Sequence, residues 1–376
     1  MNLKKRSLRA VALVCAALLV LSLASCSKKS DAPQAGAGAQ AAPAAKQKIT
    51  LRIGSGHATS NPWVAVVDNF FVPEVSKRVA EKTNYEIEWV KAYGASVIKL
   101  GNELEGIEAG LVDIGTIIIV FEPVRLMLHT MVYRMPFSCS DPMVVNKVML
   151  QLYKEFPEHV SEFEKYNQKL LGMGVCDPYS LYSNKEVRGL ADLNGMKIGA
   201  AGANLNWING SGAVPVNTSL NEVYQSLQTN VIQGTIQPTN SCYNLKVPEV
   251  APYLLEANFN VLPFNSVSIN MDKWKTLPKE VQDILVEVGN EYPDAQAKYI
   301  KEVYARDIEK MKSEGIKVYT LPREEQVKWA AALPDIVNVM VTELNGRGYK
   351  GTEIVSRYYE LLEQNGWPKV RDWKIK

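Results

Sequence analysis

The chain has 376 residues, of which 47% are hydrophobic and 22% are charged. Those proportions exclude a disordered polymer and a bundle of membrane helices, and the length allows two domains with separate cores. The 42 Lys and Arg against 40 Asp and Glu give a net charge of +2 at pH 7, too small to indicate a surface for nucleic acid.

The first 25 residues have the pattern of a signal peptide. Four cations, from Lys4 to Arg9, precede an apolar run, 10–25, that is shorter than the roughly 20 residues a permanent bilayer-spanning helix needs. The run ends in Leu23-Ala24-Ser25-Cys26, which resembles the lipobox of bacterial lipoproteins, where cleavage before the Cys leaves its sulfur to carry lipid. We expect residues 1–25 to be removed and Cys26 to be lipidated with acyl chains such as palmitate, although an ordinary secretory signal with a chance Cys is the alternative.

Residues 26–47 continue with small, polar and Pro residues that have nothing to bury, which predicts a flexible tether. The folded part is therefore expected outside the cytoplasm, in the periplasm or at the cell surface, held to a membrane by its lipid. Loss of residues 1–25 leaves 38 cations against 40 acids. Three further Cys residues allow either one disulfide or three buried free thiols: Cys139, Cys176 and Cys242.

From Lys48 the pattern alternates between strands and helices. Residues 48–55 and 85–92 alternate as strands do, and Asn61-Pro62 opens an amphipathic helix between them. Residues 100–109 have a helical pattern, and the apolar run 112–120 is typical of a strand buried on both faces. These segments predict a parallel α/β sheet.

A second set of elements follows. Its expected strands are 169–175, 196–200, 214–216 and 231–237, and its expected helices are 204–211 and 220–228. Strand 261–270 leads into a long helical stretch, 278–313, and a short strand, 316–320, precedes two terminal helices. The predicted fold class is α/β, with two lobes of mostly parallel sheet flanked by helices and joined by more than one crossing segment. Open α/β sheets bind ligands beyond the carboxyl ends of their strands, so we expect a site between the lobes, enclosed when they close.

Motifs for catalysis are missing from the sequence. It contains no G-x-S-x-G elbow, no H-E-x-x-H and no P-loop, and its three His residues and five Cys residues lack metal-ligand spacing. We therefore expect no metal, no cofactor and no enzymatic activity. The competing hypothesis is a lipid-anchored enzyme acting in the same cleft, for which Glu103 and Glu122 are acid/base candidates in principle only.

Several segments, taken in order, resemble a known family. The stretch 190–238 has a D-L-x-G-x-K-I strand, a G-A-x-P-V step and an S-x-x-E-V-Y-x-S-L-Q helix. Residues 100–113, Met135-Pro136-Phe137 and Leu262-Pro263-Phe264 also fit. Together they resemble the TRAP (tripartite ATP-independent periplasmic) transporter solute-binding proteins of the DctP type, over about residues 49–344.

The resemblance implies a periplasmic-binding-protein-like fold and a transport function. Such a receptor captures a small organic solute and delivers it to TRAP membrane permease subunits, with import driven by an ion gradient, and we expect it to be a monomer. The family's long helix underlying both lobes corresponds to 278–313. By the same likeness the first lobe comprises 48–174 plus 265–304, and the second comprises 175–264 plus 305–376 with the C-terminal helices.

The sequence departs from the family where carboxylates are usually bound. Members that bind carboxylates usually carry Arg after the K-I pair, whereas here Gly199 follows Lys197-Ile198, and a second frequent Arg falls near Tyr179. The Asn that commonly precedes the Pro of the later strand is replaced by Gln237. A carboxylate without its bidentate Arg would be an unpaired buried charge, which costs several kcal/mol.

Two interpretations of the solute follow. In one, Arg125, close to Glu122, is a displaced anchor for an organic acid. In the other, which we favour, the solute is neutral, zwitterionic or aromatic and is held by rings and amides, for which the candidates are Trp63, Tyr93, Tyr179, Asn204, Trp207, Gln237 and Tyr243. Structural alternatives stand beside these roles: Trp63 and Trp207 as core, Asn204 as a helix cap, and Arg125 with Glu122 as an ion pair.

Overall fold

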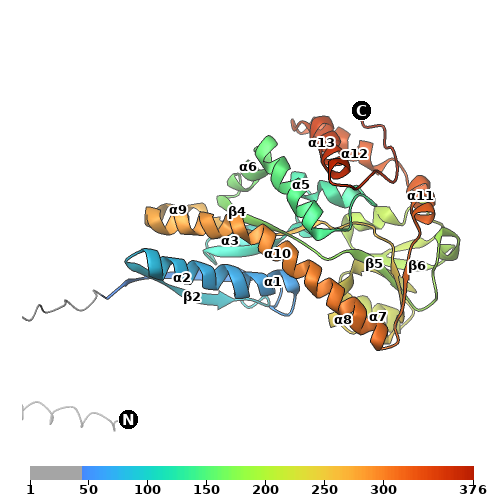
Figure 1. Ribbon diagram of the computed structural model, residues 1–376, viewed down its shortest axis with the longest axis horizontal. Helices are drawn as coiled ribbons and strands as arrows, with labels where there is room; N and C mark the ends of the chain where they lie inside the picture. Colours follow the sequence, from blue (N-terminus) through green and yellow to red (C-terminus); the bar gives the residue numbers. More distant parts are fainter. Residues whose placement is uncertain (1–44) are drawn as a thin grey trace, which may run out of the picture. The chain divides into compact units, whose positions relative to one another are not determined.

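The structure is a computed structural model that describes residues 45–376 (Figure 1). The predicted signal peptide, the lipidation of Cys26 and the tether as far as residue 44 lie outside the described residues. Within residues 45–376, no helix combines the length and the apolar character needed to cross a bilayer.

Two β-sheets organise the described part of the chain. The first sheet has the strand order β2-β1-β3-β10-β4, with β1 (Gln47–Ser55), β2 (Tyr85–Ala92), β3 (Ile114–Ile118), β4 (Gln168–Val175) and β10 (Pro263–Asn270). The second has the order β11-β9-β5-β8-β6-β7, with β5 (Tyr179–Ser183), β6 (Lys197–Ala200), β7 (Val214–Asn217), β8 (Gly234–Pro238), β9 (Tyr253–Glu256) and β11 (Lys317–Thr320). Each sheet with the helices packed on it is named a lobe below, the first lobe and the second lobe.

Each sheet is parallel except for one strand. In the first sheet only β10 runs against its neighbours, and in the second only β5 does. These are the strands that follow a crossing between the sheets: Cys176–Pro178 leads from β4 to β5, and Ala257–Leu262 leads from β9 to β10. A strand that begins at the edge where its neighbours end must run against them. The predicted mostly parallel sheets are thus confirmed, with the exceptions explained by the crossings.

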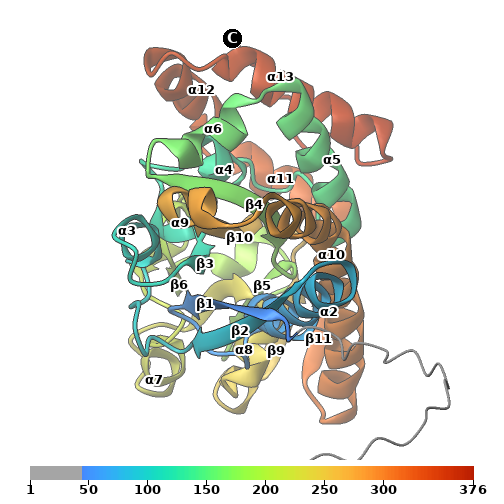
Figure 2. The same ribbon diagram turned by 90° about the vertical axis from the view of Figure 1, so that its left-hand side faces the viewer.

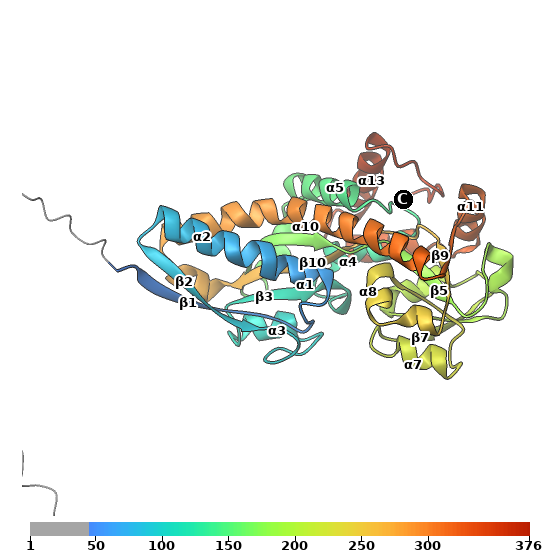
Figure 3. The ribbon, with the colours of Figure 1, turned by 60° about the horizontal axis from the view of Figure 1, so that its bottom comes forward.

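Helices cover the sheets, and the longest links them. The α-helices are α1 (Pro62–Val66), α2 (Val72–Lys82), α3 (Glu103–Glu108), α4 (Met127–Thr130), α5 (Pro142–Glu155), α6 (Glu158–Glu164), α7 (Val223–Gln228), α8 (Thr239–Asn244), α9 (Met271–Thr276), α10 (Lys279–Ser313), α11 (Arg323–Ala332), α12 (Ile336–Gly346) and α13 (Gly351–Gln364). Helix α10 packs on β4 and α5 of the first lobe and then on α8 and β11 of the second (Figure 3). The predicted long helix is therefore present.

Close contact between α10 and β4 depends on two glycines. A Cβ atom at Gly289 of α10 would overlap the carbonyl oxygen of Leu171, and one at Gly172 of β4 would lie 2.8 Å from the carbonyl oxygen of Gly289. The helix backbone consequently rests on the strand backbone, with no room for side chains between them.

Most predicted elements are present, with ends that shift by up to three residues. The predicted strand 169–175 was assigned to the second set, but it pairs with β10 in the first sheet. Strands β5 and β9 and helices α4, α5, α6, α8 and α9 were not predicted, and three helices rather than two end the chain. The predicted helix 204–211 is instead a 3₁₀ turn, Gly202–Trp207.

The three C-terminal helices contact both lobes. Helix α13 lies beside α5 of the first lobe (Figure 2), where Arg357 and Glu155 form an ion pair of 2.7 Å. Helix α11 reaches the second lobe through Trp329, whose indole N–H donates to the carbonyl oxygen of Trp207 at 2.8 Å. The predicted lobe boundaries remain predictions, but these contacts connect residues 323–376 to the first lobe as well as to the second.

We predict that Gly289→Ala destabilises the protein by about 1–3 kcal/mol, because the added methyl group meets backbone that cannot rotate away. Gly346→Ala is the matched control, since nothing lies within 4 Å of a Cβ at that helical position, and it should be neutral or slightly stabilising. Urea unfolding of both variants measures the difference. Equal stabilities would contradict the backbone contact.

Candidate functional site

The candidate site lies at the lobe junction, defined here as the region between the facing strand ends of the two sheets. Strands β1, β3 and β4 end at the edge of the first sheet that the crossing segments join, and β6, β8 and β9 end at the edge of the second sheet that the same segments join. The 3₁₀ turn Ile119–Phe121 of the first lobe contacts the turn Gly202–Trp207 of the second. Side chains at these ends can therefore meet across the junction.

Three polar side chains form what we name the junction cluster: Tyr133 from the first lobe, and Tyr179 and Asn204 from the second. Each is at most 2% exposed. Tyr133 and Asn204 lie on 3₁₀ turns that contact each other, and Trp207, from the same turn as Asn204, packs edge-on against the Tyr179 ring at 5.4 Å. Burial raises the pKa of both tyrosines well above the usual value, so both hydroxyls stay protonated.

The junction cluster contains hydrogen-bonding atoms that the described residues do not satisfy. The Tyr133 hydroxyl and both the oxygen and the nitrogen of the Asn204 amide are buried without a partner in residues 45–376. Leaving such a group unsatisfied costs about 1–3 kcal/mol, so buried polar groups are almost always paired. The cluster is suited to binding a polar group supplied from outside the chain.

Gln237 lies at the end of β8, where Ser180 of β5 is its register partner. Its side-chain nitrogen is also buried with no partner among residues 45–376. The neighbouring strand carries Gly199, where a Cβ would lie 2.5 Å from Cγ2 of Thr218 and 2.8 Å from Cδ1 of Ile232. A longer side chain at position 199 would require its neighbours to move, so β8 provides an amide at Gln237 and β6 provides no side chain at position 199.

The guanidinium group of Arg125 forms ion pairs with two glutamates. Its Nε and Nη2 donate to the two carboxylate oxygens of Glu122 at 2.7 and 2.9 Å, and its Nη1 pairs with Glu105. Among residues 45–376, no Lys or Arg side chain belongs to the buried set. The structure thus places Arg125 and Glu122 in an ion pair rather than in a free anion anchor.

Two predicted ring contacts belong to the packed core. Trp63 is fully buried, its indole N–H donates to Nδ1 of His57 at 3.1 Å, and its ring lies 4.4 Å from that of Phe264. Trp207 donates to the carbonyl oxygen of Tyr133 at 2.7 Å and stacks on Phe259. Both residues have satisfied N–H groups and packed faces, so they support the junction rather than present a binding surface.

The remaining predicted rings are Tyr93 and Tyr243, and the buried hydroxyl of Tyr93 has no partner among residues 45–376. Tyr93 is on the first lobe beside Asp68, and burial raises its pKa. Tyr243 donates to Glu314 at 2.8 Å, and Lys310 lies 5.4 Å from the centre of its ring. The Tyr243 hydroxyl is thus engaged by Glu314, which caps the C-terminal end of α10, and a ligand contact at this residue stays a prediction.

The two acid/base candidates, Glu103 and Glu122, are both bound to other groups of the chain. Glu103 accepts the backbone N–H of Gly101 at 2.7 Å, and burial raises its pKa to about 7. Burial also raises the pKa of Glu122 to about 7, against the opposing effect of Arg125. Within residues 45–376, no group of three or more His, Cys, Asp or Glu could hold a metal ion. Cys139, Cys176 and Cys242 are buried free thiols.

Sequence reasoning missed Tyr133 and Asp177. Tyr133 follows Met131 and Val132 in an apolar segment without a recognisable pattern, so nothing in the sequence distinguishes it from core. Asp177 lies in the first crossing segment, fully buried, and its Oδ2 accepts the backbone N–H of Asn240 at 2.7 Å. Its position between two strands was invisible because β5 was not predicted.

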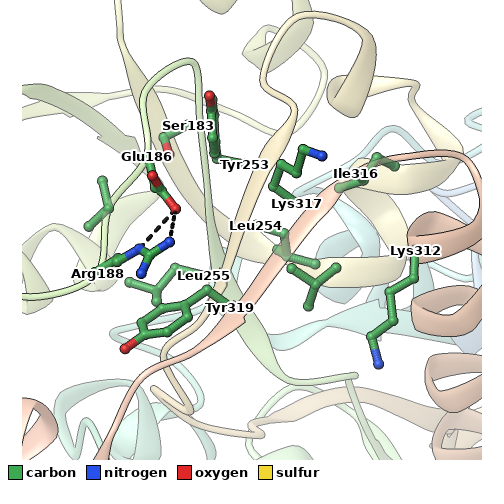
Figure 4. A pocket seen from close by; sticks show the side chains of 12 residues that line it. Ser183, Glu186, Arg188, Tyr253, Leu254, Leu255, Lys312, Ile316, Lys317 and Tyr319 are labelled. Carbon is green, nitrogen blue, oxygen red and sulfur yellow. Dashed lines mark hydrogen bonds and ion pairs between the residues drawn. The ribbon is translucent and has the colours of Figure 1, made fainter.

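A separate pocket of about 350 Å³ lies at the opposite edge of the second sheet (Figure 4). It is lined by the end of β5, the beginnings of β9 and β11, and the ion pair of Arg188 with Glu186 at 2.7 Å. Strand β5 begins at the lobe junction and ends at this pocket, so the two places are distinct.

Two α/β lobes whose strand ends face each other across crossing segments define the class of two-lobed solute-binding proteins. Over residues 55–343 the sequence matches the family described as bacterial extracellular solute-binding protein, family 7 (DctP). The chain belongs to this family, whose members are the solute-binding proteins of TRAP transporters.

Curated relatives match part of the chain. The sialic acid-binding periplasmic protein SiaP of Vibrio cholerae is 29% identical over 157 residues, which is 41% of this chain and 49% of that protein. The C4-dicarboxylate-binding periplasmic protein DctP of Rhodobacter capsulatus is 30% identical over 138 residues, which is 36% of this chain and 41% of that protein. The chain therefore spans less than half the length of each of these two relatives.

Solved structures share the fold. A TRAP periplasmic solute-binding protein from Desulfovibrio salexigens superposes with a TM-score of 0.74 at 22% identity, covering 84% of this chain and 96% of that one. A TRAP solute-binding protein from Rhodoferax ferrireducens, in complex with copurified benzoate, gives a TM-score of 0.74 at 16% identity, with 85% and 98% covered. At these identities the likeness establishes the two-lobed fold alone.

The buried carboxyl group of Asp177 makes the stability of the protein depend on pH. Burial raises its pKa from 3.8 to about 7, with Asp307 adding to the effect. Between about pH 4 and 7 the folded chain holds this proton more tightly than the unfolded chain does, so its contribution to stability falls as the pH rises through that window.

We predict that Asp177→Asn removes this part of the pH dependence, which amounts to at most about 1.4 kcal/mol per pH unit. The control is Asp283→Asn at an exposed site on α10. Urea unfolding at intervals from pH 4 to 8 measures the slopes. If Asp177→Asn has the slope of the native chain, Asp177 does not titrate in this window.

Proposed function

We propose that the chain is the extracytoplasmic receptor of a TRAP-type transporter, which captures a small organic solute at the lobe junction and delivers it to the membrane permease subunits. The observation that supports this best is the meeting of unpartnered buried amide and hydroxyl groups from both lobes, at the strand ends where α/β sheets bind ligands. Solute binding is also what the names of family relatives describe.

The proposed solute is neutral, zwitterionic or aromatic. Among residues 45–376, the buried polar side chains include no Lys or Arg, Arg125 is bound to Glu122 and Glu105, and Gly199 provides no side chain. A carboxylate enclosed there would lack a counter-charge, at a cost of several kcal/mol. An organic acid anchored by Arg125 would first have to break a bidentate ion pair.

The proposed receptor acts without chemistry, as a monomer, held to a membrane by lipid on Cys26 after loss of residues 1–25. Glu103 and Glu122, the candidates for acid/base work, are engaged with a loop N–H and with Arg125. A lipid anchor with a flexible tether would keep the two lobes near the permease.

Thermal unfolding in the presence of a library of a few hundred metabolites tests this function. A receptor is stabilised by its solute to a degree that grows with the logarithm of the solute concentration once this exceeds Kd, with no product formed in a parallel mass-spectrometric assay. Product formation would indicate an enzyme and contradict the proposed receptor function. A flat response across the library would contradict solute binding.

We predict that Gln237→Ala weakens binding of the solute so found by at least tenfold, while the unliganded melting temperature barely changes, because the lost nitrogen has no partner in the described chain. Trp207→Ala, by contrast, removes a packed ring and should cost about 3–5 kcal/mol of stability. Tyr243→Phe is the control and should retain full affinity, because the Tyr243 hydroxyl is bound to Glu314 and the substitution keeps the ring. Isothermal titration calorimetry and thermal unfolding provide both quantities. Unchanged affinity in Gln237→Ala would place the site elsewhere.

A further inference from the structure

Asn204 is the polar residue of the junction cluster with the greatest unused hydrogen-bonding capacity. It lies in the 3₁₀ turn Gly202–Trp207, is fully buried, and has neither a donor for its Oδ1 nor an acceptor for its Nδ2 among residues 45–376. It does not cap a helix, which was the alternative structural role. The side chain thus presents one acceptor and one donor on adjacent atoms.

Two hydroxyls extend this arrangement. Tyr133, from the first lobe, lies on a 3₁₀ turn that contacts the turn of Asn204, and Tyr179 packs against Trp207 of that same turn. The Trp207 side chain links the two lobes here. Its indole N–H donates to the carbonyl oxygen of Tyr133 at 2.7 Å, and its ring lies edge-on to the Tyr179 ring at 5.4 Å. Recognition at Asn204 therefore draws on both lobes.

The chemistry of these groups discriminates between classes of solute. An ionised carboxylate only accepts hydrogen bonds, so it leaves Oδ1 of Asn204 unsatisfied. An ammonium group only donates, so it leaves Nδ2 unsatisfied. An amide, lactam or imide offers a donor and an acceptor on neighbouring atoms and carries no charge, so it satisfies both atoms without the desolvation cost of an ion.

We propose that the solute presents an uncharged amide-type group, such as a carboxamide, lactam or imide, to Asn204, and that the hydroxyls of Tyr133 and Tyr179 complete its hydrogen bonding. This inference rests on the proposed receptor function and narrows its solute class. It makes Asn204 the residue that distinguishes an amide from the carboxylate of the same carbon skeleton.

The first test compares matched probes in thermal unfolding, each at 10 mM: nicotinamide with nicotinate, benzamide with benzoate, and glutamine with glutamate. In parallel, the protein is incubated with a metabolite extract, and the retained compound is released and identified by mass spectrometry. The expected result is stabilisation by amide or imide members over their carboxylate partners, and a retained compound that carries such a group.

The second test uses Asn204→Ala with Asn206→Ala as its matched control from the same turn, where Asn206 accepts from Asn209 at 3.2 Å. Asn204→Ala should lose at least tenfold in affinity for the retained compound, while its unliganded melting temperature is no lower than that of the control. Asn204→Asp, which exchanges the donor for a charge, should lose as much.

The outcomes separate the two proposals. A retained carboxylic acid without an amide-type group, or carboxylates that stabilise more than their amides, would overturn the inference about Asn204 and leave the receptor function intact. Equal affinities for Asn204→Ala and Asn206→Ala would overturn it as well. No retained compound together with a flat probe panel would overturn the receptor function, and the inference with it.

Discussion

The direction of strands β5 and β10 determines that the candidate binding site of this protein lies at the lobe junction. Each crossing segment leaves one sheet at the carboxyl end of a strand and enters the other sheet at the corresponding edge, so β5 and β10 must run against their neighbours. The same constraint turns the carboxyl ends of the parallel strands of both sheets toward each other. Helix α10, which packs on both sheets through a glycine contact at β4, supports this arrangement from outside.

Charge is the second constraint on the junction. The described residues bury several acids but no Lys or Arg. Arg125, the proposed alternative anchor, is paired with two glutamates. What remains at the strand ends is amide and phenol chemistry, in Asn204, Gln237, Tyr133 and Tyr179. Such groups discriminate by the direction of hydrogen bonds instead of by net charge, and this is why the proposed solute class differs from the dicarboxylates named for some relatives.

Local patterns in the sequence predicted the fold well where neighbours along the chain decide it. Alternation located β1 and β2, and the long helical period located α10 within one residue of its start. Pairing between distant segments was beyond such patterns: the alternation along the chain grouped strand 169–175 with the second set of elements, whereas the family likeness placed it in the first lobe, where β4 pairs with β10. At the candidate site, Tyr179 and Asn204 were expected from the sequence, and Tyr179 packs against Trp207 of the Asn204 turn. Tyr133 was not anticipated, because its burial and its contact with Trp207 depend on segments far along the chain.

The central claim is that a solute is enclosed between the facing strand ends. A distance measurement between spin labels tests it most directly, with one label at Val97→Cys on the first lobe and one at Asn217→Cys at the end of β7; the three described native thiols are buried and unreactive by comparison. The account predicts a broad distance distribution without solute and a shorter, narrower one in the presence of the compound the protein retains. An unchanged distribution in the presence of a compound that stabilises the fold would contradict it.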